Sequence, residues 1–252
     1  MKFKFLFLEM LRFLRFALLF YGLFIISLVY IGLYPVFKYY EKGEDNFEGL
    51  NKWRRRGLRT WLFFCGIRMD VRFESQIPTT PVIFCPNHFS FLDIPTMALV
   101  TGHNVLFMGK YELLKVPIFG FFFRSVDIPV PRASSVGSYR AFEKVKIRLK
   151  NGMSPIIFPE GGIKDSMPKM GMFKNGAFRL AIEEKIPIVP VTMVTNQFLM
   201  NDSGSKEGMR IGKSFVIMHT PIETKNLTLD DMLPLKQQTF DIINNTLKKY
   251  AR

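Results

Sequence analysis

The residues best suited to chemistry lie in the segment Asn87-His88-Phe-Ser-Phe-Leu-Asp93, which follows the apolar run Val82–Cys85. Imidazole takes up a proton near neutral pH, and a carboxylate can hold one of its nitrogens while the other does so. Five positions apart on one regular helix, His88 and Asp93 would point about 140° apart. We therefore expect His88 in a turn and Asp93 in the first turn of the next helix. Ser90 and Asp93 also have the spacing of a capping box, a compatible interpretation that predicts a helix starting near Ser90.

Other candidates follow further apolar runs. In Phe158-Pro-Glu-Gly-Gly162 a carboxylate, Glu160, stands beside two glycines, whose backbone can approach a ligand closely. Lys110 and Arg132 add cations that could meet an anionic group. Taken singly, these features are also typical of strand-terminating turns and solvated charges. His103 and His219 have no nearby carboxylate motif, and we expect both to be structural.

Strands and helices must alternate to position these residues. Short apolar runs bounded by Pro, Asn and Gly predict buried strands at Val82–Cys85, Val105–Met108, Ile156–Phe158, Ile188–Val194 and Phe215–Met218. Helical stretches are predicted at Tyr139–Lys150, Ala177–Glu184 and Asp230–Tyr250, and a surface loop at Thr195–Gly208. The alternation predicts an α/β domain with a mostly parallel sheet flanked by helices. Ligands bind such sheets at the carboxyl ends of the strands, where the candidates lie.

Composition narrows the class of partner. The chain has 252 residues, 48% of them apolar, and a formal charge of +14, which suits nucleic acid, an anionic membrane or a phosphorylated substrate. The 27 phenylalanines and the apolar N-terminus favour the membrane, and no nucleic-acid-binding motif is present. Cys65 and Cys85 fit neither a metal site nor a disulfide framework, so we expect no metal and a reducing compartment.

The N-terminal segment is predicted to anchor the chain to a membrane. Phe16–Tyr34 is a run of 19 uncharged residues, long enough to span a bilayer. The charges of Met1–Arg15 fall within an arc of about 160°, as in a helix lying at the interface. A second amphipathic helix, basic and rich in Trp, is predicted from Leu50 to Phe64.

Basic residues flank the apolar run on both sides, against the tendency of cations to stay on one side of a membrane. We therefore favour a helical hairpin that enters one leaflet and returns; a single span and a signal peptide are the alternatives. The predicted organisation is a membrane-anchoring two-helix segment, 1–66, and an α/β domain, 67–252, at the cytoplasmic face of the inner (plasma) membrane.

In order and spacing, these motifs resemble those of the glycerolipid acyltransferase family, which includes 1-acylglycerol-3-phosphate acyltransferases. The family's His-x4-Asp block is similar to Asn87–Asp93, and its Phe-Pro-Glu-Gly block to Phe158–Gly161. Lys110-Tyr-Glu-Leu113, Asp127 through Arg132 and Val189-Pro-Val191 match further blocks. The resemblance covers about Pro81 to Val194, nearly half of the chain.

The resemblance implies transfer of a fatty acyl group from acyl-CoA or acyl carrier protein to the sn-2 hydroxyl of a 1-acylglycerol-3-phosphate, forming phosphatidate, with no bound cofactor or metal. His88 would act as general base, oriented by Asp93. Glu160 would position the glycerol hydroxyls of this lysophospholipid acceptor, while Lys110 and Arg132 meet its phosphate. Backbone N–H groups after His88 or at Gly161–Gly162 would hold the oxyanion. Ser90 as a nucleophile is the competing hypothesis, although no Gly-x-Ser-x-Gly elbow surrounds it.

One departure concerns the acceptor. Family members often continue Phe-Pro-Glu-Gly with Thr-Arg-Ser, whose Arg meets phosphate, whereas this chain has Gly162-Ile163-Lys164. Lys164 lies one residue further on, and Lys169, Lys174, Arg132 and Lys110 could also supply that charge. A lysine would do so without the bidentate fork of arginine. The alternatives are therefore acyl transfer to a lyso-aminolipid or another lysophospholipid, an esterase or thioesterase, and a non-catalytic protein that binds anionic membranes.

Overall fold

The computed structural model describes residues 47–250 apart from 117–118, 132, 164–168 and 201–209, together with residues 6, 7, 9–11, 13, 14 and 35. The described strands are β1 (Ile67–Phe73), β2 (Ile83–Pro86), β3 (Val105–Lys110), β4 (Ile128–Val130), β5 (Ser154–Ile156), β6 (Ile188–Met193) and β7 (Gly212–Met218). The described α-helices are α3 (Phe47–Phe64), α4 (Asp93–Val100), α5 (Phe119–Ser125), α6 (Ser135–Lys150), α7 (Gly176–Glu184), α8 (Asn196–Leu199) and α9 (Met232–Tyr250). Two 3-10 helices, η1 (Tyr111–Lys115) and η2 (Leu229–Asp231), complete the set.

The described strands form one seven-stranded sheet in the order β1-β7-β6-β2-β5-β3-β4. All neighbours pair in parallel except β6 and β7, so the predicted mostly parallel sheet is confirmed. Because β2, β3, β4, β5 and β6 run the same way, their carboxyl ends lie at one edge. The strand predicted at Phe215–Met218 lies within β7, but the antiparallel direction of β7 and its pairing with β1 were not predicted.

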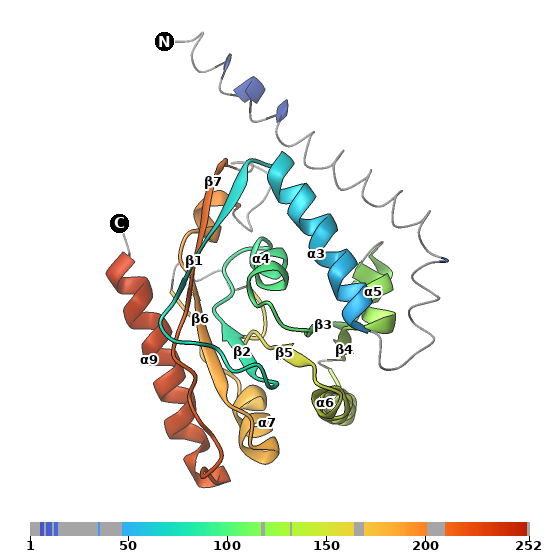
Figure 1. Ribbon diagram of the computed structural model, residues 1–252, viewed down its shortest axis with the longest axis vertical. Coiled ribbons are helices and arrows are strands. Elements are labelled where there is room, and N and C mark those ends of the chain that lie inside the picture. The colour runs from blue at the N-terminus through green and yellow to red at the C-terminus, as the bar shows by residue number, and fades with distance from the viewer. Residues whose placement is uncertain are drawn as a thin grey trace.

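Helices cover both faces of the sheet, as the sequence predicted. On one face Cys85 of β2 belongs to a buried cluster with α6, α7 and α9; on the other, Phe84 packs with Met97 and Ala98 of α4. Figure 1 shows α6, α7 and α9 on one side of the sheet and α4 on the other. The alternation of Phe84 and Cys85 follows from the two-residue period of a strand.

The helix predicted at Leu50–Phe64 is α3, but one of its basic residues does not face outward. Phe47 and Leu50 join the core cluster of the sheet, and Arg54 is buried with its guanidinium bonded to both oxygens of Asp127, at 2.9 and 3.0 Å. The sequence predicted an amphipathic, basic helix here but not the burial of Arg54, because periodicity does not show a distant carboxylate. The division of the chain at residue 66 stays a prediction.

The apolar run Phe16–Tyr34 lies outside the described residues, so the predicted hairpin stays a prediction. Within the part of the chain that the structure describes, no helix has both the length and the apolar character to cross a membrane.

Candidate active site

His88 and Asp93 meet at the carboxyl edge of the sheet, where β2 ends. The side chain of Asn87 donates to the carbonyl of Met193 at 3.2 Å and accepts from its N–H at 2.7 Å, which fastens the exit of β2 to the end of β6. The next residue, His88, turns its Nδ1 to Asp93 Oδ2 at 3.1 Å. Since a carboxylate accepts, this contact places the proton of the neutral imidazole on Nδ1 and leaves Nε2 as an acceptor.

Asp93 also closes the turn between β2 and α4. Its Oδ2 accepts from the backbone N–H groups of Phe89 and Ser90, both at 2.9 Å, and the side chain is fully buried. The helix begins at Asp93 itself, three residues later than the predicted start near Ser90. The carboxylate thus holds the turn and the imidazole together, so the two interpretations of Asp93 apply at once.

The ring of His88 has its orientation fixed from a second side. Phe158 stacks on it with the ring centroids 4.0 Å apart and the planes 24° from parallel. His88 is 8% exposed, and Nε2 bonds to no group in the described part of the chain. One nitrogen of a positioned imidazole is therefore left for a ligand.

Glu160 lies beside His88 but is fully engaged by backbone groups. Its Oε1 accepts from the N–H of His88 at 2.9 Å, its Oε2 accepts from the N–H of Gly171 at 2.8 Å, and only 1% of the residue is exposed. Burial raises the pKa of Glu160, and the hydrogen bonds from Gly171 and His88 oppose that shift. This geometry suits a clamp between two loops better than the predicted contact with the acceptor's hydroxyls.

Gly161 and Gly162 form the turn that follows, with φ of 77° and 145°. A Cβ on Gly161 would lie 2.7 Å from Cε of Lys174, whose side chain crosses the turn. The N–H of Gly161 is used by the carbonyl of Phe158 at 3.0 Å, whereas that of Gly162 has no partner among the described residues. The turn therefore combines an open N–H group with a neighbouring cation, as an anion site requires.

The other predicted cations have different outcomes. Lys110 ends β3 at the same edge of the sheet and is exposed. Arg132 and Lys164 lie outside the described residues. No group of three His, Cys, Asp or Glu side chains is placed to hold a metal ion within the described ranges.

Ser90 is placed as a structural residue. Its hydroxyl donates to the carbonyl of Met200 at 2.6 Å and accepts from the N–H of Leu92 at 3.1 Å. Because the hydroxyl hydrogen is directed to a carbonyl and not to a base, the geometry speaks against Ser90 as a nucleophile.

His103 and His219 lie elsewhere with partners of their own. His103 Nδ1 is 3.1 Å from Ser154 Oγ. His219 is held between Thr192 Oγ1 at 2.7 Å and Glu74 Oε2 at 3.0 Å, a carboxylate contact that the sequence did not predict. Burial lowers the pKa of both histidines.

Asn196 is a site residue that the sequence interpretation missed. It is the first residue of α8, directly beyond β6, and its Nδ2 donates to Asp93 Oδ1 at 2.9 Å. The sequence could have indicated it, because Asn196 follows the buried run Ile188–Val194 and ligands bind at the carboxyl ends of parallel strands.

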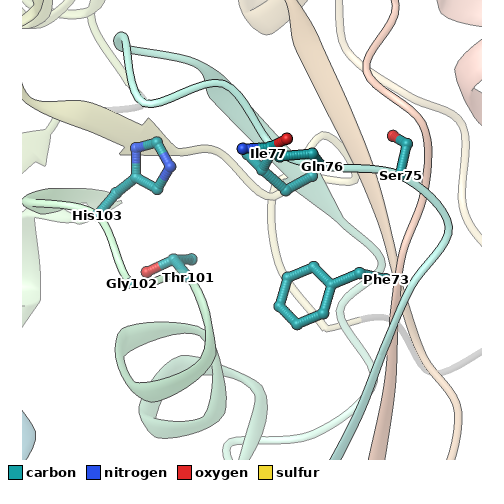
Figure 2. Close-up of a pocket in the computed structure, with 7 residues that line it drawn as sticks. All are labelled: Phe73, Ser75, Gln76, Ile77, Thr101, Gly102 and His103. Carbon is teal, nitrogen blue, oxygen red and sulfur yellow. The ribbon is translucent and has the colours of Figure 1, made fainter.

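A cavity of about 490 Å³ is lined by none of His88, Asp93 and Glu160 and lies near the start of β3. Figure 2 shows Thr101 and His103 on one side of it and Phe73 and Ser75 on the other. It contains no predicted site residue.

Comparisons with known proteins identify the family to which this chain belongs. The acyltransferase family model matches residues 68–194. The chloroplastic 1-acyl-sn-glycerol-3-phosphate acyltransferase of Brassica napus is 30% identical over 158 residues, 62% of this chain and 45% of the relative. The 1-acyl-sn-glycerol-3-phosphate acyltransferase of Saccharomyces cerevisiae is 31% identical over 191 residues, 73% of this chain and 61% of the relative. This chain thus spans less than half the length of the Brassica napus relative.

The crystal structure of the 1-acyl-sn-glycerophosphate acyltransferase from Thermotoga maritima has the same fold, with a TM-score of 0.69 and 26% identity. The match covers 96% of this chain and 98% of that one. The family model spans half of the chain and includes His88, Asp93 and Glu160. The chain therefore belongs to the acyltransferase family.

Proposed function

We propose that this protein transfers a fatty acyl group from an acyl thioester to the sn-2 hydroxyl of 1-acylglycerol-3-phosphate, forming phosphatidate. The observation that carries the proposal is the His88–Asp93 pair, whose remaining imidazole nitrogen is open at the carboxyl edge of the sheet. The names of the relatives from Brassica napus and Saccharomyces cerevisiae support the choice of acceptor.

In the proposed reaction, His88 Nε2 takes the proton of the acceptor's hydroxyl as the oxygen attacks the thioester carbonyl. A C–O bond forms, the carbonyl oxygen becomes an oxyanion, and the C–S bond then breaks. The proton on His88 passes to the departing thiolate, so the imidazole returns to its starting state. General base catalysis of this kind contributes about 10²–10⁴-fold.

The oxyanion needs a donor that the fold does not already use. The N–H groups of His88, Phe89 and Ser90 are all bonded to carboxylates, which speaks against Phe89 and Ser90 as the oxyanion donors after His88. The N–H of Gly162 has no partner in the described ranges and lies in the turn after β5. We assign the oxyanion to it, because a preorganised N–H group stabilises charge where it develops.

For the acceptor's phosphate we favour Lys174, which crosses the glycine turn next to Glu160. Lys110 at the end of β3 is a second candidate, and Arg132 and Lys164 remain predictions from the sequence. Ile163 in place of the usual Arg also keeps a lyso-aminolipid acceptor as the alternative, because lysine binds phosphate as a point charge without a bidentate fork.

The proposed donors, acyl-CoA and acyl carrier protein, are both acidic, and a chain with a formal charge of +14 attracts them electrostatically. Attachment to the cytoplasmic face of the inner (plasma) membrane, with its anionic lipids, is part of the proposal. It would bring the lipid acceptor and the soluble donor to one site.

The test is acyl transfer by the purified full chain in detergent, with palmitoyl-CoA and lysophosphatidate, followed as thiol release and phosphatidate formed. Burial raises the pKa of both cysteines, to about 11 for Cys65, so a thiol reagent near pH 8 reports the CoA product. His88→Ala should lose at least about 100-fold in kcat. His103→Gln, a matched histidine outside the site, should keep parental activity.

Full activity in His88→Ala would overturn the mechanism. Activity on a lyso-aminolipid alone would overturn the choice of acceptor. Free fatty acid in place of phosphatidate would show that water is the acceptor, so that the chain acts as a thioesterase.

A further inference from the structure

A closed set of buried hydrogen bonds lies behind Asp93, on the side away from His88. Asn196 Nδ2 donates to Asp93 Oδ1 at 2.9 Å and lies 3.3 Å from Thr96 Oγ1. Its Oδ1 accepts from Ser214 Oγ at 2.6 Å, and the two hydroxyls of Ser214 and Thr96 are 3.3 Å apart. None of the four side chains is more than 1% exposed, so none exchanges these bonds for water.

The protons of this set can be arranged in one consistent direction. The Thr96 hydroxyl donates to Ser214, the Ser214 hydroxyl donates to Asn196 Oδ1, and Asn196 Nδ2 donates to both Thr96 and Asp93. A flipped Asn196 amide would turn its oxygen toward a carboxylate oxygen and its NH2 group toward the Ser214 hydroxyl. Because a carboxylate only accepts whereas a hydroxyl can donate or accept, Asp93 fixes which end of the amide faces it, and the Ser214 and Thr96 hydroxyls hold the amide in place.

We propose that Asn196 is a positioning residue for acyl transfer, acting through Asp93 to hold His88 in its working orientation and tautomer. The proposal rests on the proposed function. Asp93 Oδ2 accepts three hydrogen bonds, from His88, Phe89 and Ser90, but Asn196 is the one donor to Oδ1 among the described residues.

The sheet topology brings Asn196, Ser214 and Thr96 together. Asn196 follows β6, Ser214 belongs to β7 and Thr96 to α4, so the set joins the antiparallel side of the sheet to the helix that carries Asp93. Asn196 directs its N–H to the carboxylate that holds His88, so its removal should change the acid–base behaviour of the site.

The decisive variant is Asn196→Asp, which keeps the shape and places a second carboxylate against Asp93. Two adjacent buried carboxylates share one proton near neutral pH. Asp93 is then fully ionised, and accepts the His88 Nδ1–H as strongly as in the parent, only at higher pH. We expect kcat/KM near pH 7 to fall about 10- to 100-fold, as for the loss of an outer-shell partner. The loss should shrink toward pH 9, so that the acid limb of the profile moves to higher pH.

Ser214→Ala is the milder second variant. It leaves the donor to Asp93 but removes the hydroxyl that donates to Asn196 Oδ1, so the amide is held less firmly, and we expect a loss of up to about tenfold. Because the chain has three histidines, the imidazole nitrogen resonances can be assigned by NMR. In both variants His88 should show a mixture of its two neutral tautomers. If Asn196→Asp does not fold, the tautomer and rate of Ser214→Ala decide.

Asn51→Ala is the matched control, since Asn51 is also a fully buried asparagine and bonds to the carbonyl of Val105 at 2.8 Å, outside the site. It should lower the unfolding temperature without moving the pH profile. Parental kcat/KM in Asn196→Asp, or an equal loss at every pH with an unchanged His88 tautomer, would overturn the proposal. If His88→Ala is active in the same assay, the proposed function fails and not merely the role of Asn196.

Discussion

Arg54→Met should destabilise the protein strongly although Arg54 lies on a helix that reads as a basic surface. The guanidinium donates to both oxygens of Asp127, at 2.9 and 3.0 Å, and to the carbonyl of Val105 at 2.9 Å. It also lies over the rings of Phe107 and Phe122, with its carbon 5.1 Å from each centroid. Methionine fills similar apolar space but supplies no donor.

The magnitude follows from what the substitution leaves behind. The Asp127 side chain is 5% exposed and, among the described residues, would keep one hydrogen-bond donor, the N–H of Phe107 at 2.9 Å. Removing one partner of a buried ion pair costs about 3–5 kcal/mol. For a chain of this size each kcal/mol shifts the midpoint by about 2–4 °C, so a fall of about 6–20 °C is expected.

Thermal unfolding of the full chain in detergent measures this effect. Arg56→Met is the control on the same helix, because Arg56 is exposed and its guanidinium carbon lies 5.4 Å from the Trp53 ring centroid. Its loss should cost about 1 kcal/mol or less. Adding Asp127→Asn to Arg54→Met should restore much of the stability, because the buried charge is then removed.

Binding to vesicles that contain anionic lipid is a second measurement on which Arg54→Met and Arg56→Met should differ. A basic residue at the membrane surface contributes about 1 kcal/mol, so Arg56→Met should weaken binding. Arg54→Met should bind as the parent does at temperatures well below its midpoint. A small change in midpoint together with weaker vesicle binding in Arg54→Met would refute the buried ion pair.

Three further predictions concern the site and the core. Ser90→Ala should keep kcat within about tenfold, because the hydroxyl bonds to the carbonyl of Met200; a loss above about 1000-fold would make Ser90 a nucleophile. Gly161→Ala should cost about 1–3 kcal/mol in unfolding and lower kcat, since φ is 77° and a Cβ would meet Lys174; an unchanged midpoint and rate contradict this. Burial lowers the pKa of His219, so the unfolded state takes up its proton first, and stability should fall as the pH is lowered from about 7 through the ordinary pKa of 6.5. His219→Gln should show a smaller fall in melting temperature over that range, and an equal slope would exclude His219 as the cause.

The sequence predicted those elements whose signal is local. Buried parallel strands are short apolar runs, and β2, β3, β6 and β7 lie where such runs were found. The edge strand β1 was missed because Arg68, Asp70 and Arg72 interrupt its apolar residues, although this alternation is itself typical of a half-buried strand. The three-residue β4 contains Pro129 and offers too little pattern to be recognised.

The direction of β7 was also within reach of the sequence. Parallel strands need a crossover, usually a helix, and Thr195–Gly208 was predicted to be a loop. The connection contains only the four-residue α8 among its described residues, and β7 pairs with β6 in the antiparallel direction. A polar connection without a long helix therefore indicates that the two strands it joins are antiparallel, and not only that the connection lies at the surface.

The contact between His88 and Asp93 was predicted from the sequence, whereas the bonds of Asn196 and Glu160 were not. The spacing of His88 and Asp93 after a strand was sufficient to expect their contact, which lies at 3.1 Å. Asn196 is 103 positions from Asp93, and Glu160 is 72 from His88, so both contacts depend on the order of the strands. No local pattern distinguishes a Glu160 that faces a ligand from one that holds two backbone N–H groups.

The partners of Asp93 bear on how the pair would work. Its donors are two backbone N–H groups, the amide of Asn196 and the imidazole of His88, and no Lys or Arg bonds to it in the described part of the chain. Fixed dipoles therefore solvate the carboxylate without neutralising it. On the proposed mechanism, the imidazole of His88 carries a full positive charge beside Asp93 only after it has taken the acceptor's proton. The attraction between the two is then strongest in the transition state, and a stabilisation that grows along the reaction lowers the barrier, whereas a permanent cation beside Asp93 would weaken it.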